Sequence, residues 1–486
     1  MLSTGIDYLI GLLIDRAKIT RHQYWKATSW IFGSAIFYLL ITWPSDGFNI
    51  SQVSINPLGL KIIPGLALAW GLASLFLRDI SRKEMAIDKR KIYVGISISS
   101  NLIILCFFKY FNFFIDSAEE VIHSLGGDAQ LYQLDIILPV GISFYTFQTI
   151  SYSIDIYRKQ VKPTGNFLDF ALFVAYFPQL VAGPIERAKN LLPRILYPRS
   201  VSYEQATRGV FLISWGLFKK IAIADSVAAS VNSVYNTTGA VSWLDVILAT
   251  VLFAIQIYCD FSAYSDIARG TSKLLGIELM RNFNLPYFAS NPSEFWRRWH
   301  ISLSSWLRDY LYIPLGGNKH GSLKTYRNLS ITMLLGGLWH GAAWNFILWG
   351  GYQGAILSIH RFFTINKKRA TPSGFISGLK IILFFAVTCY GWLLFRANSV
   401  SQIIDFTSIL LFQWPDMSIH IKRPPLVAML SIPLLFLYEI IEYKSGNILF
   451  YLRTRRPILG GVVAYTLLLI AMGLSNEPTQ FIYFQF

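Results

Sequence analysis

The sequence predicts an all-helical protein that crosses a membrane many times. Of its 486 residues, 53% are hydrophobic and only 14% are charged, whereas about a quarter of the residues in a soluble domain are charged. The apolar residues gather into long runs, many of them near the roughly 20 residues that a helix needs to cross the bilayer core. Examples of these runs are 30–43, 62–77, 92–114, 243–261, 426–437 and 458–472. We therefore expect about ten spanning helices in one domain, 1–486.

Charged residues lie between the apolar runs in the pattern that is typical of a membrane protein. Six basic residues lie in 78–91, whereas 115–135 contains no lysine or arginine. Basic loops are retained on the cytoplasmic side of a membrane, so we assign the basic loops to the cytoplasm. A net charge of +16 would otherwise suggest nucleic-acid binding. Because topology accounts for this charge, we expect no nucleic-acid partner.

Two apolar segments, 169–183 and 328–360, interrupt this alternation because basic residues lie on both sides of each. At about 1.5 Å per residue, the second segment is too long for a single crossing. We interpret it as a re-entrant segment that enters from the cytoplasm and returns, with breaks at Gly336-Gly337 and Gly350-Gly351. Irregular backbone at membrane depth is tolerated only where protein buries it or where it lines a cavity. This interpretation therefore predicts a pocket.

The intervening region 269–327 is too polar to span a bilayer. Four of its residues recur at helical spacing: Trp299, Leu303, Trp306 and Tyr310. His300, Ser304 and Arg308 form an adjoining stripe. This pattern predicts an amphipathic helix that lies in the membrane interface, with its tryptophan and tyrosine side chains at the level of the headgroups.

His340 is the first candidate for chemistry. It lies in LLGGLWHGAAWNFILWGG (334–351), among apolar, aromatic and glycine residues. Polar groups within a bilayer are costly and are often functional, and a neutral imidazole is suited to act as general base on a hydroxyl acceptor. The alternative is a core histidine that is hydrogen-bonded to a carbonyl group. Five further histidines are expected to be solvated: His22, His123, His320, His360 and His420.

A second group of candidates ends the segment EFWRRWH (294–300). Arg297 and Arg298 are suited to hold an anionic donor such as the phosphates of coenzyme A, or they anchor the helix at the lipid headgroups. His300 is either a site residue or a structural one.

Asp260 and Asp266 lie in YCDFSAYSDIARG (258–270), at the end of an apolar run. They either form a polar cluster that links helices or shape and polarise the pocket. No metal site is predicted, because the three cysteines lie in apolar stretches and form no CxxC pair. The sequence contains no P-loop, HExxH or GxSxG motif.

Two long motifs resemble the membrane-bound O-acyltransferase family. They are YCDFSAYSDIARGTSKLLGIELMRNFNLPYFASNPSEFWRRWHISLSSWLRDYLYIPLGGN (258–318) and GLWHGAAWNFILWG (337–350). Shorter segments are also similar, including FPQLVAGPIER (177–187), WLLFRA (392–397) and FIYFQF (481–486). Within the family, the chain is similar to the bacterial branch that O-acetylates alginate and transfers D-alanine to teichoic acids.

The resemblance implies a fold of many helices around a central funnel, with a core motif region at 138–397. His340 matches the family's catalytic histidine, and His300 matches its second motif histidine. Further residues are expected to line the pocket or bind the donor: Asp260, Trp296, Arg297, Arg298, Trp339 and Asn345.

The resemblance also implies the substrates and the location. The donor is a cytoplasmic thioester, acetyl-CoA or an acyl-carrier thioester, and no cofactor is bound. The acceptor is an envelope polysaccharide outside the bacterial cytoplasmic (inner) membrane, with an extracytoplasmic SGNH-type acyltransferase as a partner. Three alternatives stay open: D-alanyl transfer from a carrier protein, a proton-coupled transporter or flippase, and a structural scaffold.

Overall fold

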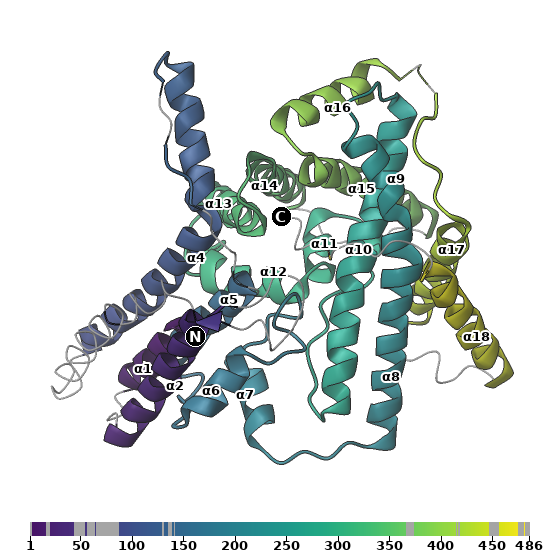
Figure 1. Cartoon of the computed structure of the whole chain (residues 1–486). Coiled ribbons are helices and arrows are strands. Elements are labelled where there is room, and N and C mark those ends of the chain that lie inside the picture. The colour runs from purple at the N-terminus through teal and green to yellow at the C-terminus, as the bar shows by residue number, and fades with distance from the viewer. Residues whose placement is uncertain are drawn as a thin grey trace. The chain divides into compact units, whose positions relative to one another are not determined.

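Helices make up almost all of the regular structure in the computed structural model of the protein (Figure 1). The structure describes residues 2–15, 20–42, 54–55, 64, 87–128, 131–134, 139, 141–365, 374–414, 416, 418–446, 456–474 and 481. Within these residues the only strands are β1 (Ile41–Thr42) and β2 (Ser54–Ile55), which pair antiparallel. The predicted all-helical fold class is confirmed.

The chain divides into two compact units. Unit 1 comprises 1–111, 133–180 and 186–199, and unit 2 comprises 112–132, 181–185 and 200–486. A compact unit is not by itself an independently folding domain, so the single domain stays a prediction. The helices of unit 1 are α1 (Leu2–Ile14), α2 (Arg21–Leu40), α5 (Ile142–Tyr157), α6 (Phe167–Val174) and α7 (Ala188–Leu196). Helix α4 (Ile87–Ser124) begins in unit 1 and ends in unit 2.

A buried polar cluster links three helices of unit 1. The carboxylate of Asp7 on α1 accepts hydrogen bonds from Ser97 Oγ at 2.6 Å and from Asn101 Nδ2 at 2.8 and 2.9 Å on α4. Thr149 on α5 donates to Asn101 Oδ1 at 3.0 Å. Burying a polar group is costly unless it is hydrogen-bonded, so these bonds allow a carboxylate that is 0% exposed to lie in an apolar core.

Unit 2 carries both candidate histidines. Its α-helices are α8 (Tyr203–Leu217), α9 (Ser226–Tyr235), α10 (Trp243–Leu274), α11 (Pro292–Arg298), α12 (Ile301–Leu307), α13 (Ser322–His340), α14 (Trp344–Thr364), α15 (Gly374–Arg396), α16 (Val400–Phe412), α17 (Leu426–Ser445) and α18 (Arg456–Gly473). The π-helix η2 (Phe218–Asp225) joins α8 to α9, the 3-10 helix η3 (Pro286–Phe288) precedes α11, and the π-helix η4 (Arg308–Tyr312) follows α12. Helices α8 and α10 lie side by side (Figure 1).

Four of the described helices are long and apolar enough to cross a membrane: Lys89–Ser124, Trp243–Leu274, Gly374–Arg396 and Leu426–Ser445. They contain the predicted runs 92–114, 243–261 and 426–437. The run 458–472 falls in α18, and most of the run 30–43 falls in α2. Apart from Pro64, the run 62–77 lies outside the described residues. The helices indicate a multi-pass membrane protein, and ten spans stay a prediction.

The segment 328–360 turns back on itself, as predicted, but not at its glycine pairs. Helix α13 continues through Gly336-Gly337 and α14 continues through Gly350-Gly351, and the chain reverses at 341–343. The glycines instead allow close packing of the two helices. A Cβ atom at Gly337 would lie 2.3 Å from the carbonyl oxygen of Phe346, and one at Gly350 would lie 2.5 Å from that of Met333. The predicted breaks were therefore wrong. Both glycine pairs lie within helices, where small residues let two backbones approach each other.

This packing predicts different effects for substitutions at two adjacent glycines. Gly350→Ala should destabilise the protein by about 1–3 kcal/mol, the usual cost of overpacking, because its new methyl group meets the backbone. Gly351→Ala is the matched control, because its Cβ would lie 3.7 Å from its nearest neighbour, Leu334 Cδ2. Thermal unfolding in detergent should show a lower midpoint for Gly350→Ala and an equal or higher one for Gly351→Ala. Equal midpoints in the two variants would contradict this account of the packing.

Candidate active site

His340 is the last residue of α13, and its side chain lies in a shell of aromatic rings. Its imidazole lies 5.0 Å from the ring of Trp339, 5.2 Å from that of Trp349 and 5.4 Å from that of Phe395, measured between centroids. His340 is 7% exposed. The chain reversal at 341–343 therefore positions a polar, titratable group among aromatic side chains.

His300 lies beside this shell and is fully buried. Its ring centroid is 4.6 Å from that of Phe261 on α10 and 6.1 Å from that of Trp339. Its backbone is in the left-handed conformation, with φ 42° and ψ 56°. That conformation is uncommon for residues other than glycine and costs about 1–3 kcal/mol.

Asn282 is a residue that the sequence analysis missed, and it fixes the turn that contains His300. The carbonyl oxygen of Asn282 accepts from the N–H of Ile301 at 2.8 Å. Its side-chain oxygen accepts from the N–H of Ser302 at 3.2 Å and from Ser302 Oγ at 2.9 Å. No local pattern signals these contacts, because Asn282 lies about twenty residues away in the sequence.

Both ring nitrogens of His300 are buried without a hydrogen-bond partner among the described residues. Burial first, and then the charge on His340, lower the pKa of His300 well below its usual value. His300 is therefore neutral near pH 7. A neutral imidazole offers one N–H donor and one acceptor nitrogen, and neither has a partner among the described residues.

The predicted helix over Trp299–Tyr310 exists only in part. Helix α12 begins at Ile301, and η4 contains Arg308 and Tyr310. His300 therefore precedes the helix and does not share a stripe with Ser304, so that part of the prediction was wrong. Trp299, Leu303 and Trp306 are buried within the protein. Their predicted face is a packing surface, and its position at the membrane interface stays a prediction.

Trp296, Trp339 and Asn345 all lie near the histidines. The ring of Trp339 packs against both imidazoles, and that of Trp296 lies 5.9 Å from that of Trp349. Asn345 Nδ2 donates to the carbonyl oxygens of Phe395 at 3.2 Å and Ala397 at 3.0 Å. Asn345 thus attaches the end of α15 to the start of α14, which keeps Phe395 against His340.

The two arginines of the EFWRRWH segment have different surroundings. Arg298 donates to Glu294 at 2.8 and 3.0 Å and to the carbonyl oxygen of Asn284 at 3.1 Å. Arg297 is exposed, and its charge is the second cause, after burial, of a lowered pKa at His360. The exposed side chain of Arg297 is the more accessible of the two to an external anion.

Asp260 and Asp266 each form ion pairs with α8–η2–α9. Asp260 pairs with Lys220 at 2.8 Å, and Lys220 also pairs with Asp225 at 2.8 Å. Asp266 pairs with Lys219 at 2.7 Å. These contacts support the interpretation of a polar cluster that links helices, and a role of Asp260 in the pocket stays a prediction. Two adjacent lysines within the apolar segment FKKIAIA (218–224) were the signal for these pairs.

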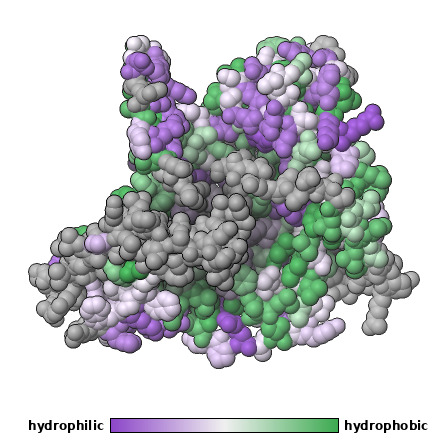
Figure 2. Space-filling view, viewed as in Figure 1, coloured by the Kyte–Doolittle hydropathy of each residue, from purple (hydrophilic) through white to green (hydrophobic). Residues whose placement is uncertain are grey.

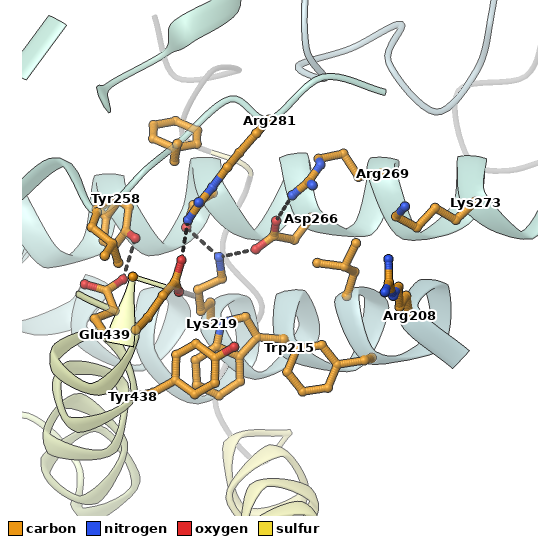
Figure 3. A pocket seen from close by; sticks show the side chains of 17 residues that line it. Arg208, Trp215, Lys219, Tyr258, Asp266, Arg269, Lys273, Arg281, Tyr438 and Glu439 are labelled. Carbon is orange, nitrogen blue, oxygen red and sulfur yellow. Dashed lines mark hydrogen bonds and ion pairs between the residues drawn. The ribbon is translucent and has the colours of Figure 1, made fainter. Parts of the chain in front are cut away.

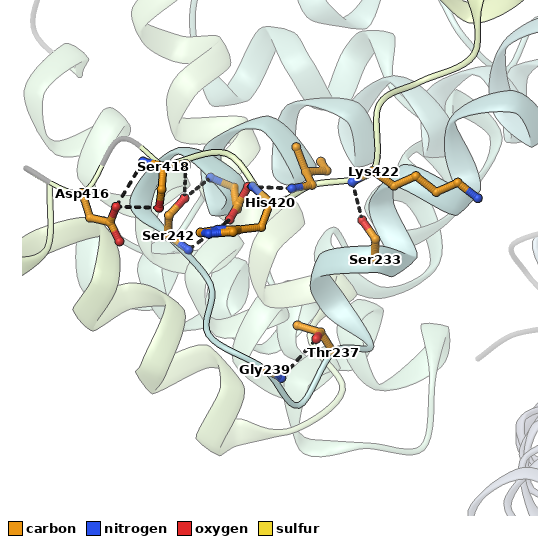
Figure 4. Close-up of polar contacts among 10 residues, drawn as sticks. Ser233, Thr237, Gly239, Ser242, Asp416, Ser418, His420 and Lys422 are labelled. Carbon is orange, nitrogen blue, oxygen red and sulfur yellow. Dashed lines mark hydrogen bonds and ion pairs between the residues drawn. The ribbon is translucent and has the colours of Figure 1, made fainter.

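His420 was expected to be solvated, and its side chain is 60% exposed, but it also has a buried partner. Asp245, on the first turn of α10, contacts His420 Nδ1 at 3.0 Å and accepts from the backbone N–H groups of His420 and Ile421 at 2.8 and 2.9 Å (Figure 4). These contacts attach the segment before α17 to the start of α10. Among the described residues, no group of three or more metal-binding side chains of His, Cys, Asp or Glu comes together.

The sequence model of MBOAT, the membrane-bound O-acyltransferase family, matches residues 159–400 and thus includes both histidines. The chain contains a domain of this family. It is 44% identical over 316 residues to the probable alginate O-acetylase of Pseudomonas aeruginosa. It is 36% identical over 344 residues to the peptidoglycan O-acetyltransferase of Helicobacter pylori, and 29% identical over 283 residues to the teichoic acid D-alanyltransferase of Bacillus subtilis.

These similarities cover parts of each protein. They include 64%, 65% and 54% of this chain for the three relatives in that order. The chain spans 58% of the length of the Pseudomonas aeruginosa protein, 64% of the Helicobacter pylori protein and 70% of the Bacillus subtilis protein. The family match thus concerns the part of the chain that carries His300 and His340.

The lowered pKa of His300 predicts a pH-dependent stability. The unfolded chain binds a proton at this histidine below about pH 6.5, whereas the folded protein excludes it. Stability should therefore fall as the pH drops below about 6.5, by at most about 1.4 kcal/mol per pH unit from this group. His300→Asn, which tolerates the left-handed backbone, should show a smaller difference in unfolding midpoint between pH 5 and pH 7.5. His320→Asn, at an exposed position, is the control, and an identical pH dependence in all three proteins would refute the prediction.

The ion pair of Asp260 predicts a coupled effect on stability. Asp260→Ala removes an acceptor from half-buried, charged Lys220 and should cost about 1.5–3 kcal/mol, the range for hydrogen bonds to charged groups. In the double variant with Lys220→Met, the loss of stability should be smaller than the sum of the two single losses. The reason is that Lys220→Met also removes the positive charge that Asp260→Ala leaves without its partner. Unfolding midpoints of the four proteins in detergent measure this coupling, and additive losses would show that the pair contributes nothing.

Proposed function

We propose that the chain is a membrane O-acyltransferase that moves an acetyl group from a cytoplasmic thioester to an extracytoplasmic polysaccharide. The observation that carries the proposal is the position of His340, an imidazole at a chain reversal within an aromatic shell, with a second imidazole beside the same shell. The names of the alginate and peptidoglycan relatives support acetyl as the group and a polysaccharide as the acceptor.

In the proposed reaction, His340 acts as general base. It takes the proton of an acceptor hydroxyl as the hydroxyl oxygen attacks the thioester carbonyl carbon. The new C–O bond forms, the C–S bond breaks, and the proton passes from His340 to the departing thiolate. His300 stays neutral and orients the reactants through its two ring nitrogens. The aromatic side chains exclude water, which limits hydrolysis of the thioester.

The donor is proposed to be acetyl-CoA or an acyl-carrier thioester, which approaches from the cytoplasm past exposed Arg297. An arginine fork matches the geometry of a phosphate, so Arg297 would hold the phosphates of such a donor, with Arg298 fixing the local backbone. The proposal includes about ten spanning helices around a funnel, location in the bacterial inner membrane and an SGNH-type partner that completes delivery outside. It requires no bound cofactor.

D-alanyl transfer is less well supported than acetyl transfer. The teichoic acid D-alanyltransferase is 29% identical to this chain, compared with 44% and 36% for the two acetyl-transferring relatives. A transporter or flippase is likewise not favoured by the names of the relatives.

The proposal predicts that transfer depends on His340. In membranes that contain the full chain and its envelope partners, label from acetyl-CoA should enter the polymer fraction. His340→Ala should reduce this transfer by at least about 100-fold, the lower range for loss of a general acid–base group. His320→Ala, at an exposed position, should retain it. Transfer is compared at equal amounts of folded protein.

Two outcomes would contradict parts of this function. Full labelling by His340→Ala would exclude His340 as the base. Labelling only from a D-alanyl carrier protein, with none from acetyl-CoA, would favour the alanyl alternative.

A further inference from the structure

Unit 2 contains a cavity of about 440 Å³ whose lining includes neither His300 nor His340 (Figure 3). It lies between α8, α10, α17 and residues that precede η3. Its volume falls within the roughly 300–1,000 Å³ that is typical of sites for small ligands. The family match and the proposed reaction assign no role to this cavity.

The wall of the cavity is rich in cations. Five basic residues line it: Arg208, Lys219, Arg269, Lys273 and Arg281. Three acidic residues line it: Asp266, Glu439 and Glu442. Five basic and three acidic groups thus face the cavity, and two further carboxylates pair with basic residues of its wall. Glu204 and Glu278, which pair with Arg208 and Lys273, lie outside the lining and are 68% and 47% exposed.

The internal contacts leave most of the arginine donors unused. Arg269 contacts Asp266 through Nη1 at 3.2 Å, and Arg281 contacts Glu442 through Nη2 at 2.8 Å. Arg208 contacts Glu204 through Nη2. Each guanidinium carries five N–H donors and uses one of them in these pairs. Figure 3 shows Lys219, Asp266 and Arg269 joined in a row, with Lys273 and Arg208 beyond them.

The cavity adjoins aromatic and apolar surface. The rings of Trp215 on α8 and Tyr438 on α17 pack 4.4 Å apart in its lining. Three residues that are next in sequence to lining residues are exposed: Val210 (56%), Leu274 (40%) and Leu437 (56%). Figure 2 shows hydrophobic side chains over the area where Figure 1 draws α8 and α17. Tryptophan and tyrosine gather where membrane proteins meet lipid headgroups.

From these observations we infer that the cavity binds the phosphate of an anionic phospholipid headgroup. The arginines supply forked donors, which match phosphate oxygens in pairs, and five basic side chains line the cavity. The apolar surface at Val210, Leu274 and Leu437 receives the acyl chains. This surface favours a lipid over a soluble phosphate ester, which carries no apolar tail to cover it.

The inference is independent of the proposed transfer reaction, because its test measures lipid binding. The full chain, purified in detergent, is titrated with phosphatidylglycerol and with zwitterionic phosphatidylcholine, and bound lipid is counted by native mass spectrometry. We expect phosphatidylglycerol to bind about ten-fold more tightly, since one hydrogen bond to a charged group is worth about that factor. Arg208→Gln and Lys273→Gln should each lose most of this preference.

Two further variants separate geometry from charge. Arg281→Lys keeps the charge but loses the fork, and it should still weaken phosphatidylglycerol binding. Lys422→Gln removes one positive charge from an exposed side chain near the opposite end of α10 and should bind as the wild type does. Unfolding midpoints confirm that each variant is folded.

Three results would overturn the inference. If the wild type and the cavity variants retain equal amounts of phosphatidylglycerol, the lipid does not bind in this cavity. If phosphatidylglycerol and phosphatidylcholine bind equally well, the negative charge of the headgroup does not determine binding. Displacement of lipid by adenosine 3′,5′-bisphosphate or inorganic phosphate, with the same dependence on Arg208 and Arg281 and no preference for phosphatidylglycerol, would assign the cavity to a soluble phosphate ester.

Discussion

The backbone contact between α13 and α14 is the constraint on which the position of His340 depends. At Gly337 and Gly350 the two helices lie so close that a Cβ atom would overlap a carbonyl oxygen of the neighbouring helix. Close packing leaves only 341–343 for the reversal, and His340 is therefore the last helical residue before the turn. Asn345 then begins the return helix and attaches the end of α15. The contact between α13 and α14 thus brings α13, α14 and α15 together around the imidazole of His340.

Charged pairs provide the second set of constraints in unit 2. Adjacent lysines on η2, Lys219 and Lys220, reach Asp266 and Asp260 on α10. Lys219 pairs with the later residue of α10, Asp266, and Lys220 pairs with the earlier one, Asp260, as expected for two segments that run antiparallel. A shift of one helix along the other would break both pairs at once. Buried ion pairs contribute little net stability, because desolvation offsets the attraction, but losing one partner is costly. We therefore attribute to these pairs the register of α8–η2–α9 against α10.

Sequence analysis predicted the features that depend on composition and local periodicity. The helical fold class, several of the spans and the reversal within 328–360 follow from apolar runs and from the length of a helix. The breaks at Gly336-Gly337 and Gly350-Gly351 were wrong, because glycine in an apolar helix serves packing as often as it ends the helix.

Other features were not predictable because they depend on contacts between distant residues. The turn at His300 rests on Asn282, and the lining of the cavity joins Arg281 to Glu442 across 161 residues. A helical pattern that continues from Trp299 through His300 carries no sign of such contacts. For the same reason, the single partner of each arginine in that lining could be found only from the structure.

The two histidines differ in what their surroundings allow. Burial lowers the pKa of His300 and so disfavours its protonation, and the charge on His340 lowers this pKa further. In the proposed reaction the proton moves through His340, so His300 must act as a neutral group. With both ring nitrogens lacking partners among the described residues, it can donate one hydrogen bond and accept another. A neutral donor held in a strained turn is suited to orient a thioester carbonyl, because its position does not change as charge develops on the oxygen.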